Sequence, residues 1–295
     1  MQPSGFGMDG FAVALLGTSA QAEAAVASAG GRIGARMRWG GDVAAATARV
    51  LVIEACGVDD AVLDAALPAI AASMRDVAVV ATIDAAQIDR VAAALLGPRT
   101  TLLCDPTPAD RIAALVLAAR ARGLPGSVRE GGDEGERLRA LHAEVARIAA
   151  LLAGLAEEPE TAASTVDDRR GSYGAEPAET PIDPAEIRRA IRARRLRAQY
   201  FDPRLLEDPG WDMLLDLFAS ELEGGQVSVS SLCIAAAVAP TTALRWITRL
   251  IATGLFVRVA DNEDRRRAFL VLAPAASAAM HAYCTAIRRA GLAIA

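Results

Sequence analysis

The residues best suited to chemistry are threonines and arginines that share one face of a short segment near the C-terminal end. Residues 241–253 read TTALRWITRLIAT, and Leu244, Ile247 and Leu250 recur at helical spacing. The opposite face of this predicted helix carries Thr241, Thr242, Arg245, Thr248 and Arg249. An arginine can bond a guanine through two hydrogen bonds, and it can also pair with a phosphate. The pattern therefore indicates a helix that meets nucleic acid.

A second group of arginines lies in the polar stretch DNEDRRR at residues 261–267. It separates two apolar runs, residues 255–260 and 268–273, which we expect to be paired strands. Arginines at the tip of such a hairpin suit the minor groove or its phosphates, where negative potential attracts guanidinium groups. The two aspartates of the stretch are expected to hold its three arginines by salt bridges: Asp261 and Asp264 with Arg265, Arg266 and Arg267. The alternative is a solvated turn with local ion pairs.

Two short helices followed by this hairpin form a winged helix-turn-helix, whose second helix enters the major groove of DNA. Residues 228–237 open with serines suited to an N-cap and form the first helix, and Gly254 ends the second. Residues 185–290 resemble the MarR family of bacterial winged-helix regulators. The strongest match is the wing pattern Asp261-x-x-Asp264-Arg265-Arg266, followed by an apolar strand and a helix. The resemblance implies DNA binding as a dimer and control of transcription.

The predicted contacts with double-stranded DNA come from both helices and from the wing. Arg245 is placed to read a base, whereas Arg249 is placed to touch phosphate. The full set is Ser230, Thr241, Thr242, Arg245, Arg249, Arg258, Arg265, Arg266 and Arg267. This interpretation requires that DNA can reach Thr241 and Arg245. We expect Trp246 to lie in the core.

Charge is unevenly distributed along the chain. Residues 1–183 carry 16 arginines and 25 acidic residues, a net of −9, and residues 184–295 carry 15 arginines and 11 acidic residues, a net of +4. The two sum to the −5 of the whole chain. The C-terminal part is basic and the rest of the chain is acidic, which favours contact between the C-terminal part and a polyanion. Six of the arginines lie in residues 184–200, which we expect to form a basic helix. Besides contact with a polyanion, this helix suits a dimer contact or a solvated face.

The elements that precede this module alternate between strand and helix. Residues 11–17, 33–39, 49–56, 76–83 and 100–104 are short apolar runs typical of strands, and helical patterns cover 20–29, 60–74, 85–96 and 108–122. This alternation predicts an α/β domain with a five-stranded parallel sheet in the doubly wound, flavodoxin-like order. The outline resembles the receiver domain of bacterial response regulators, over about residues 10–122.

The polar residues at the predicted strand ends depart from the receiver pattern. Gly17-Thr18-Ser19 follows the first strand in place of an acidic pair, so the usual Mg²⁺ ligands are lacking and phosphotransfer is not expected. Glu54 and Thr82 are candidate regulatory residues of such a pseudo-receiver. Glu54 would mimic a phosphorylated residue, or it is simply a carboxylate at a strand end. A small ligand would find a pocket among Thr18, Ser19, Glu54, Thr82, Asp84 and Asp105.

The middle of the chain suggests a dimer contact followed by a tether. Apolar residues are spaced 3-4-3-4-3 between residues 134 and 157, as in a coiled coil: Leu138, Leu141, Val145, Ile148, Leu152 and Leu155. We expect this seam to join two copies of the chain, although an amphipathic helix packed on its own domain fits as well. Residues 158–183 are rich in Pro, Glu, Thr, Ser and Gly and suit a flexible linker. Residues 1–9 suit a flexible leader, and residues 184–295 form the winged-helix domain.

Several classes of function lack support in the sequence. The four cysteines are far apart, there are two histidines, and no nucleophile–histidine–acid set or P-loop occurs. We therefore predict no catalytic residues, no metal and no cofactor. No apolar run reaches the ~18 residues of a membrane span, so we expect a cytoplasmic, nucleoid-associated protein.

Three hypotheses follow for the whole chain. The first is a homodimeric, sequence-specific transcription regulator in which the pseudo-receiver regulates or dimerises the winged helix. The second is a small-ligand or nucleotide-binding signalling protein. The third is a winged helix that contacts only other proteins.

Overall fold

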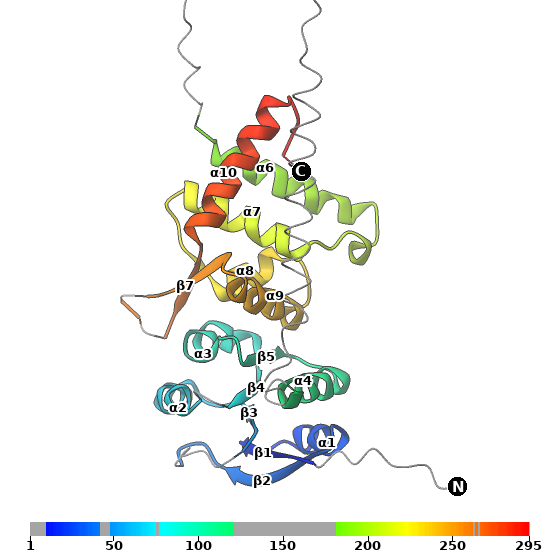
Figure 1. Cartoon of the computed structure of the whole chain (residues 1–295), viewed down its shortest axis with the longest axis vertical. Coiled ribbons are helices and arrows are strands. Elements are labelled where there is room, and N and C mark those ends of the chain that lie inside the picture. The colour runs from blue at the N-terminus through cyan, green and yellow to red at the C-terminus, as the bar shows by residue number, and fades with distance from the viewer. Residues whose placement is uncertain are drawn as a thin grey trace, which may run out of the picture. The chain divides into compact units, whose positions relative to one another are not determined.

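The computed structural model describes residues 10–41, 48–74, 77–120, 181–261, 263–264 and 266–294. They belong to one compact unit made of two stretches of the chain, which are coloured blue to green and green to red in Figure 1. We call residues 10–120 the α/β lobe and residues 181–294 the winged-helix lobe. The predicted leader, the predicted coiled coil and almost all of the predicted linker lie outside the described residues.

A five-stranded parallel sheet forms the centre of the α/β lobe. Its strands are β1 (Phe11–Leu16), β2 (Gly31–Met37), β3 (Val50–Glu54), β4 (Ala78–Ile83) and β5 (Thr100–Cys104). Their order in the sheet is β2-β1-β3-β4-β5, so β2 and β5 are the outer strands. This is the doubly wound order predicted from the alternation of apolar runs and helical patterns. The three inner strands are apolar because helices cover both faces of the sheet.

Helices pack on both faces of this sheet. One face is covered by α1 (Ala20–Ser28) and α4 (Pro108–Arg120), and the other by α2 (Asp60–Ser73), the short 3₁₀ turn η1 (Ala85–Gln87) and α3 (Ile88–Leu95). Alternate residues of each strand point to alternate faces: Val13 and Leu15 pack with α1, whereas Ala14 and Leu16 face the other side. The described part of the α/β lobe thus has four α-helices, as the helical patterns predicted.

The winged-helix lobe begins with two helices that pack on each other. They are α6 (Pro184–Leu196), with a 3₁₀ turn η2 (Arg197–Gln199), and α7 (Pro209–Leu222), preceded by a 3₁₀ turn η3 (Pro203–Leu205). Helix α6 ends earlier than the predicted residue 200, because its last turn tightens into η2. Helix α7 starts at Pro209, which suits the first turn of a helix, and the Asp208 side chain caps it by accepting a hydrogen bond from Trp211 N.

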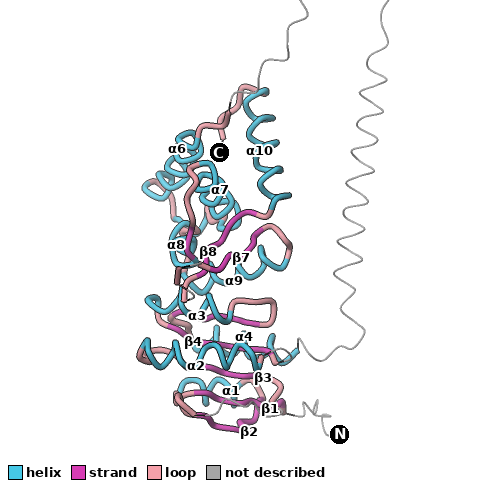
Figure 2. Tube along the Cα trace, turned by 90° about the vertical axis from the view of Figure 1, so that its left-hand side faces the viewer, coloured by secondary structure: helices cyan, strands magenta, loops and turns pink. Residues whose placement is uncertain are grey.

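The rest of this lobe has the predicted order of helix, helix, hairpin and helix (Figure 2). Its elements are β6 (Val227–Ser228), α8 (Val229–Ala235), α9 (Pro240–Ala252), β7 (Phe256–Ala260), β8 (Ala268–Leu272) and α10 (Pro274–Arg289). The three strands form an antiparallel sheet in the order β6-β8-β7. The hairpin β7–β8 is the predicted wing.

Two arginines of the basic helix α6, Arg188 and Arg194, bond acidic residues of α7. Arg188 Nη1 lies 2.6 Å from Asp216 Oδ1, its Nε and Nη2 donate to Glu223, and Arg194 Nε donates to Asp212 Oδ1 at 2.6 Å. The hydrogen bonds from Arg188 lower the pKa of Glu223. These arginines therefore join two helices of one lobe.

Candidate nucleic-acid interface

The helix pair α8–α9 has the geometry of a helix-turn-helix. Ser228 caps α8 by accepting a hydrogen bond from Ser231 N at 3.2 Å, as its position predicted. The turn contains Ala237 in the left-handed region, with φ +54°, and Pro240 then starts α9. The axes of α8 and α9 differ in direction by 110°, within the range found for helix-turn-helix motifs.

Helix α9 separates apolar from charged residues as the sequence predicted. Leu244, Ile247 and Leu250 are buried, whereas Arg245 and Arg249 are exposed. The Arg249 guanidinium lies 5.2 Å from the centroid of the Trp246 ring. That ring also packs against Gly210 at the start of α7, where an added Cβ would lie 3.1 Å from it. Trp246 is thus half-buried in the lobe, in line with the expected core position.

Thr241 departs from the prediction, because the α/β lobe covers it. Its side chain is 9% exposed, and its Oγ1 accepts a hydrogen bond from Cys104 N at 2.8 Å and donates one to Cys104 O at 2.7 Å. In a strand, the N–H and C=O of one residue point to the same side. A hydroxyl can serve both because it donates and accepts. Helix α9 therefore packs along the outer strand β5, 137 residues away in sequence.

Two further predicted DNA contacts also meet the α/β lobe. Ser230 N and Oγ lie 2.8 and 2.5 Å from the two carboxylate oxygens of Asp89, in the first turn of α3. Arg258 Nη1 donates to carbonyl oxygens at the end of α3: Ala92 O at 2.9 Å, Ala93 O at 3.0 Å and Leu96 O at 3.3 Å. The last carbonyls of a helix lack partners within the helix, and a cation there also suits the helix dipole.

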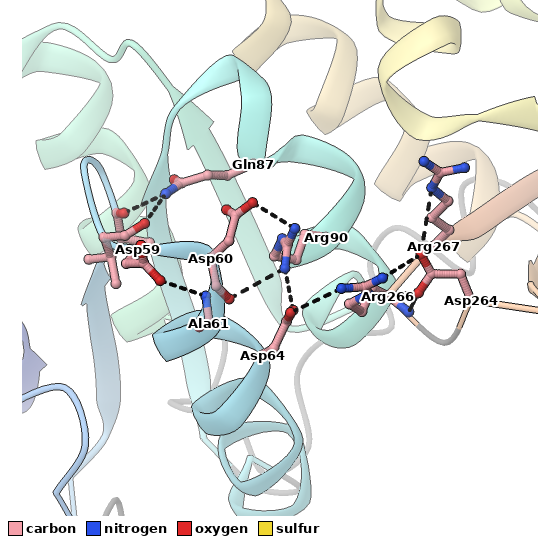
Figure 3. Close-up of polar contacts among 11 residues, drawn as sticks. Asp59, Asp60, Ala61, Asp64, Gln87, Arg90, Asp264, Arg266 and Arg267 are labelled. Carbon is pink, nitrogen blue, oxygen red and sulfur yellow. Dashed lines mark hydrogen bonds and ion pairs between the residues drawn. The ribbon is translucent and has the colours of Figure 1, made fainter.

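The wing is held by acidic residues from two sources (Figure 3). Asp264 accepts a hydrogen bond from Arg266 Nε at 2.8 Å and lies 3.9 Å from Arg267 Nε, which confirms the predicted salt bridges of that aspartate. Asp261 accepts a hydrogen bond from Glu263 N, and among the described wing residues it forms no ion pair with Arg266 or Arg267. Arg266 Nη1 also lies 3.5 Å from Asp64 of α2.

Asp64 is itself fixed within the α/β lobe. Figure 3 shows it between Arg266 of the wing and Arg90 of α3, which also bonds Asp60 at 2.8 Å. Arg265 lies outside the described residues. Thr242 is half-buried at the start of α9. Of the nine predicted DNA contacts, Ser230, Thr241, Arg258 and Arg266 thus contact the α/β lobe.

A polar pocket lies at the carboxyl ends of the parallel strands. It has a volume of about 700 Å³, and the residues that line it include all six that the sequence suggested: Thr18, Ser19, Glu54, Thr82, Asp84 and Asp105. Glu54 and Thr82 are register partners on β3 and β4, and Thr82 Oγ1 donates to Glu54 Oε1 at 3.0 Å. Strand pairing in the doubly wound order therefore brings these two residues together.

Arg111 is a pocket residue that the sequence reasoning missed. Its Nη1 lies 2.6 Å from Glu54 Oε1 and 3.0 Å from Thr82 Oγ1, and the residue is 7% exposed. An arginine on the buried face of α4, in register with Ala114, Leu115 and Ala118, was the available signal. Because Arg111 neutralises Glu54, that carboxylate is a member of a buried ion pair.

Burial also decides the state of the thiols near this edge. Burial, with Asp105 and Asp84 nearby, raises the pKa of Cys104 to about 11. Cys56 is exposed, but partial desolvation of its thiol, with Asp84 and Glu54 nearby, raises its pKa to about 12. All four cysteines are free. Both of these thiols are therefore protonated near neutral pH. In the described ranges, no cluster of three or more His, Cys, Asp or Glu residues could hold a metal ion.

The predicted dimerisation residues lie in the middle of the sequence, between residues 134 and 157. Leu138, Leu141, Val145, Ile148, Leu152 and Leu155 all lie outside the described residues. Within the described part of the chain, no single helix is long and apolar enough to cross a membrane; the bent pair α8–α9 meets that length and composition only when counted together.

Comparisons with known proteins give partial likenesses. No protein-family model and no curated protein matches the chain. Among solved structures, MepR of S. aureus bound to ethidium bromide is 16% identical, with a TM-score of 0.26, over 36% of this chain and 71% of that one. BpsR of Bordetella bronchiseptica, whose DNA binding is described as regulated by 6-hydroxynicotinic acid, is 23% identical, with a TM-score of 0.22, over 35% and 79%. A MarR-family regulator from Silicibacter pomeroyi is 22% identical, with a TM-score of 0.20, over 36% and 65%.

Proposed function

We propose that the chain is a sequence-specific DNA-binding transcription regulator that acts as a homodimer. Helix α9 enters the major groove and the wing arginines contact the minor groove or the backbone. The α/β lobe is the regulatory or dimerisation module. The observation that carries the proposal is one face on which two exposed arginines, Arg245 and Arg249, lie one helical turn apart beside a wing with Arg266 and Arg267.

The charge distribution supports the same conclusion. The winged-helix stretch is net positive in a chain that is net negative overall, and two arginines of α6, Arg188 and Arg194, are paired with acidic residues of α7. The basic groups exposed on α9 and on the wing form a surface that suits a polyanion. Arg245 is the exposed arginine of α9 that lies nearer the N-terminal end of the helix, the end that enters the groove, so it is better placed than Arg249 for a base edge.

A mobility-shift assay with duplex DNA at two salt concentrations tests the proposal. Contacts with phosphates release counterions, so we expect affinity to fall about 10- to 100-fold between roughly 50 and 200 mM salt. A pool of random duplexes selected with the full chain should converge on a two-fold related site, as a dimer requires. If no duplex binds at low salt, the winged helix serves another partner.

The pocket supports a second candidate function, a small-ligand or nucleotide-binding signalling role for the α/β lobe. Ligands of doubly wound domains bind at the carboxyl ends of the strands, where this pocket lies. A compound that binds there should raise the melting temperature of the full chain.

A further inference from the structure

We propose that the α/β lobe competes with DNA for the DNA-reading face, by which we mean the predicted DNA contacts on α8, α9 and the wing. A surface made of β5, α3 and Asp64 of α2 binds that face. DNA binds there only after this surface has separated from it. We call the arrangement in the structure the closed form and this surface the occluding surface. The inference rests on the proposed function and names the regulation of the same site.

The first observation is which residues the occluding surface contacts. Ser230, Thr241, Arg258 and Arg266 were predicted to touch DNA from the pattern of the winged helix alone. Each of them contacts the α/β lobe, through Asp89, Cys104, the carbonyls at the end of α3, and Asp64 respectively. A surface that only joined two lobes would have no reason to select these four residues.

The second observation is steric. Thr241 is the second residue of α9, in the turn that must enter a major groove about 12 Å wide. In the closed form this turn lies against the backbone of β5, with both hydrogen bonds of the hydroxyl satisfied by Cys104. Duplex DNA and β5 cannot occupy the same side of α9 together.

The third observation is chemical. The occluding surface presents mainly oxygen acceptors: the carboxylates of Asp89 and Asp64, three carbonyls at the end of α3, and Cys104 O. DNA offers the same kind of acceptor through its phosphates and base edges. The α/β lobe therefore offers the basic face the same kind of acceptor that DNA would offer it.

The fourth observation is a groove along the contact between the two lobes. A groove of about 230 Å³ runs between β5 and α9, lined by Thr100, Leu102, Arg245 and Arg249 among others. Arg245 and Arg249 are exposed in the closed form, so part of the DNA-reading face is reachable before separation. A phosphate that binds these arginines first would favour the open form.

The test uses variants of the full chain that change only the occluding surface. Asp89→Ala removes both hydrogen bonds to Ser230 and leaves every predicted DNA contact in place. The apparent dissociation constant varies inversely with the fraction of open molecules, and a hydrogen bond to a charged group is worth about a factor of ten. We therefore expect Asp89→Ala to bind a fluorescent 30-base-pair duplex about tenfold more tightly than the wild type.

Glu23→Ala is the matched control. Glu23 is also an acidic residue in the first turn of a helix, and its partner Arg36 lies on β2, the outer strand opposite β5. The substitution changes net charge by the same amount, so a general electrostatic effect would raise affinity equally in both variants. Circular dichroism checks that both variants stay folded.

Hydrogen exchange provides a second measurement that does not depend on affinity. Cys104 N–H and Ser230 N–H are donors in the closed contact. We expect saturating DNA to increase exchange in the peptide that covers β5, the reverse of the protection that a ligand gives to its own site. Asp89→Ala should increase this exchange without DNA.

The outcomes separate the two proposals. If the wild type binds DNA but Asp89→Ala binds no more tightly than Glu23→Ala, or if DNA leaves exchange in β5 unchanged, competition by the α/β lobe is wrong and the DNA-binding function stands. If no variant binds duplex DNA although Asp89→Ala exchanges faster in β5, the proposed function itself fails, and competition with DNA fails with it.

Discussion

At the scale of single residues, Arg245 carries the most specific expectation. It is exposed on α9, one turn before Arg249, and was predicted to read a base. Replacing it with alanine should cost about 1–3 kcal/mol on the preferred site and relax specificity at one base pair. Fluorescence anisotropy on the preferred site and on single-base variants measures this. Arg192→Ala, an exposed arginine of α6 with the same charge change, is the control, and a uniform loss across all sites would contradict base reading by Arg245.

The buried ion pair of Glu54 and Arg111 is expected to contribute to the free energy of unfolding. Arg111→Ala leaves the Glu54 carboxylate buried with Thr82 as its remaining side-chain partner. Removal of one member of a buried ion pair typically costs about 3–5 kcal/mol, and we expect a loss near the lower value in urea unfolding. Arg120→Ala, at the exposed end of the same helix, should cost less than about 1 kcal/mol. Glu54→Met combined with Arg111→Met should recover most of the loss; if it does not, the pair has a further role.

The Cys104 thiol predicts how stability depends on alkaline pH. Its pKa is raised to about 11 in the folded chain, against about 8.5 in an unfolded one. Below the unfolded value the thiol is neutral in both states, so its contribution to stability is fully present there. Between these two values the unfolded chain loses the proton and the folded chain keeps it, so the free energy of unfolding falls as pH rises.

Urea unfolding of the wild type and of Cys104→Ala at pH 7.5 and pH 10 measures this contribution. We expect the wild type to lose about 1–2 kcal/mol more than the variant between these two pH values. Equal losses would mean that the thiol ionises as freely in the folded chain as in the unfolded one.

At the scale of elements, the sequence predicted most of the fold because the signals are local. Strands β3, β4 and β5 are buried apolar runs, and their predicted bounds differ from the observed ones by at most two residues. The inner strands are recognisable because burial on both faces demands uninterrupted apolar residues. Strand β2 begins two residues earlier than predicted, at Gly31, because its alternating exposure weakens the apolar signal of an outer strand.

The candidate site was only partly predictable, for a physical reason. Register between neighbouring strands brings Glu54 and Thr82 together, and doubly wound order brings the strand ends together. In contrast, the contact of Thr241 with Cys104 depends on how two distant surfaces pack. Neither helical spacing nor charge specifies which strand a recognition helix will meet, so Asp89, Asp64 and Cys104 carried no signal.

The turn between α8 and α9 also yields a stability prediction. Ala237 has φ +54°, a conformation that costs an L-residue roughly 1–2 kcal/mol and glycine far less. Ala237→Gly should therefore stabilise the chain by about 0.5–1 kcal/mol in urea unfolding, since the added entropy of the unfolded chain offsets part of the gain. The neighbouring Ala236→Gly, at φ −65°, should instead destabilise by a similar amount. Destabilisation by both changes would contradict a strained turn.

At the scale of the whole molecule, the seam at residues 138–155 carries the prediction of a homodimer. An arginine in the middle of such a seam places charge where two apolar faces meet. Ile148→Arg should shift sedimentation equilibrium toward the monomer and weaken binding to a two-fold site, because half-sites are no longer bound together. Ala146→Arg, next to the seam position Val145 but off the seam, adds the same charge and should leave the dimer intact. Equal dimerisation of both variants would assign the seam to packing within one chain.

The packing of α9 along β5 has a consequence for solubility. An outer strand presents free backbone donors and acceptors on one side, and proteins commonly shield such strands against addition of a strand from another molecule. In the closed form the Thr241 hydroxyl occupies one donor–acceptor pair of TTLLC, and α9 packs along the same strand. Molecules that release α9 uncover an apolar strand of high β-propensity. Aggregation should therefore increase with the released population, and refolding into the closed form protects the protein from it.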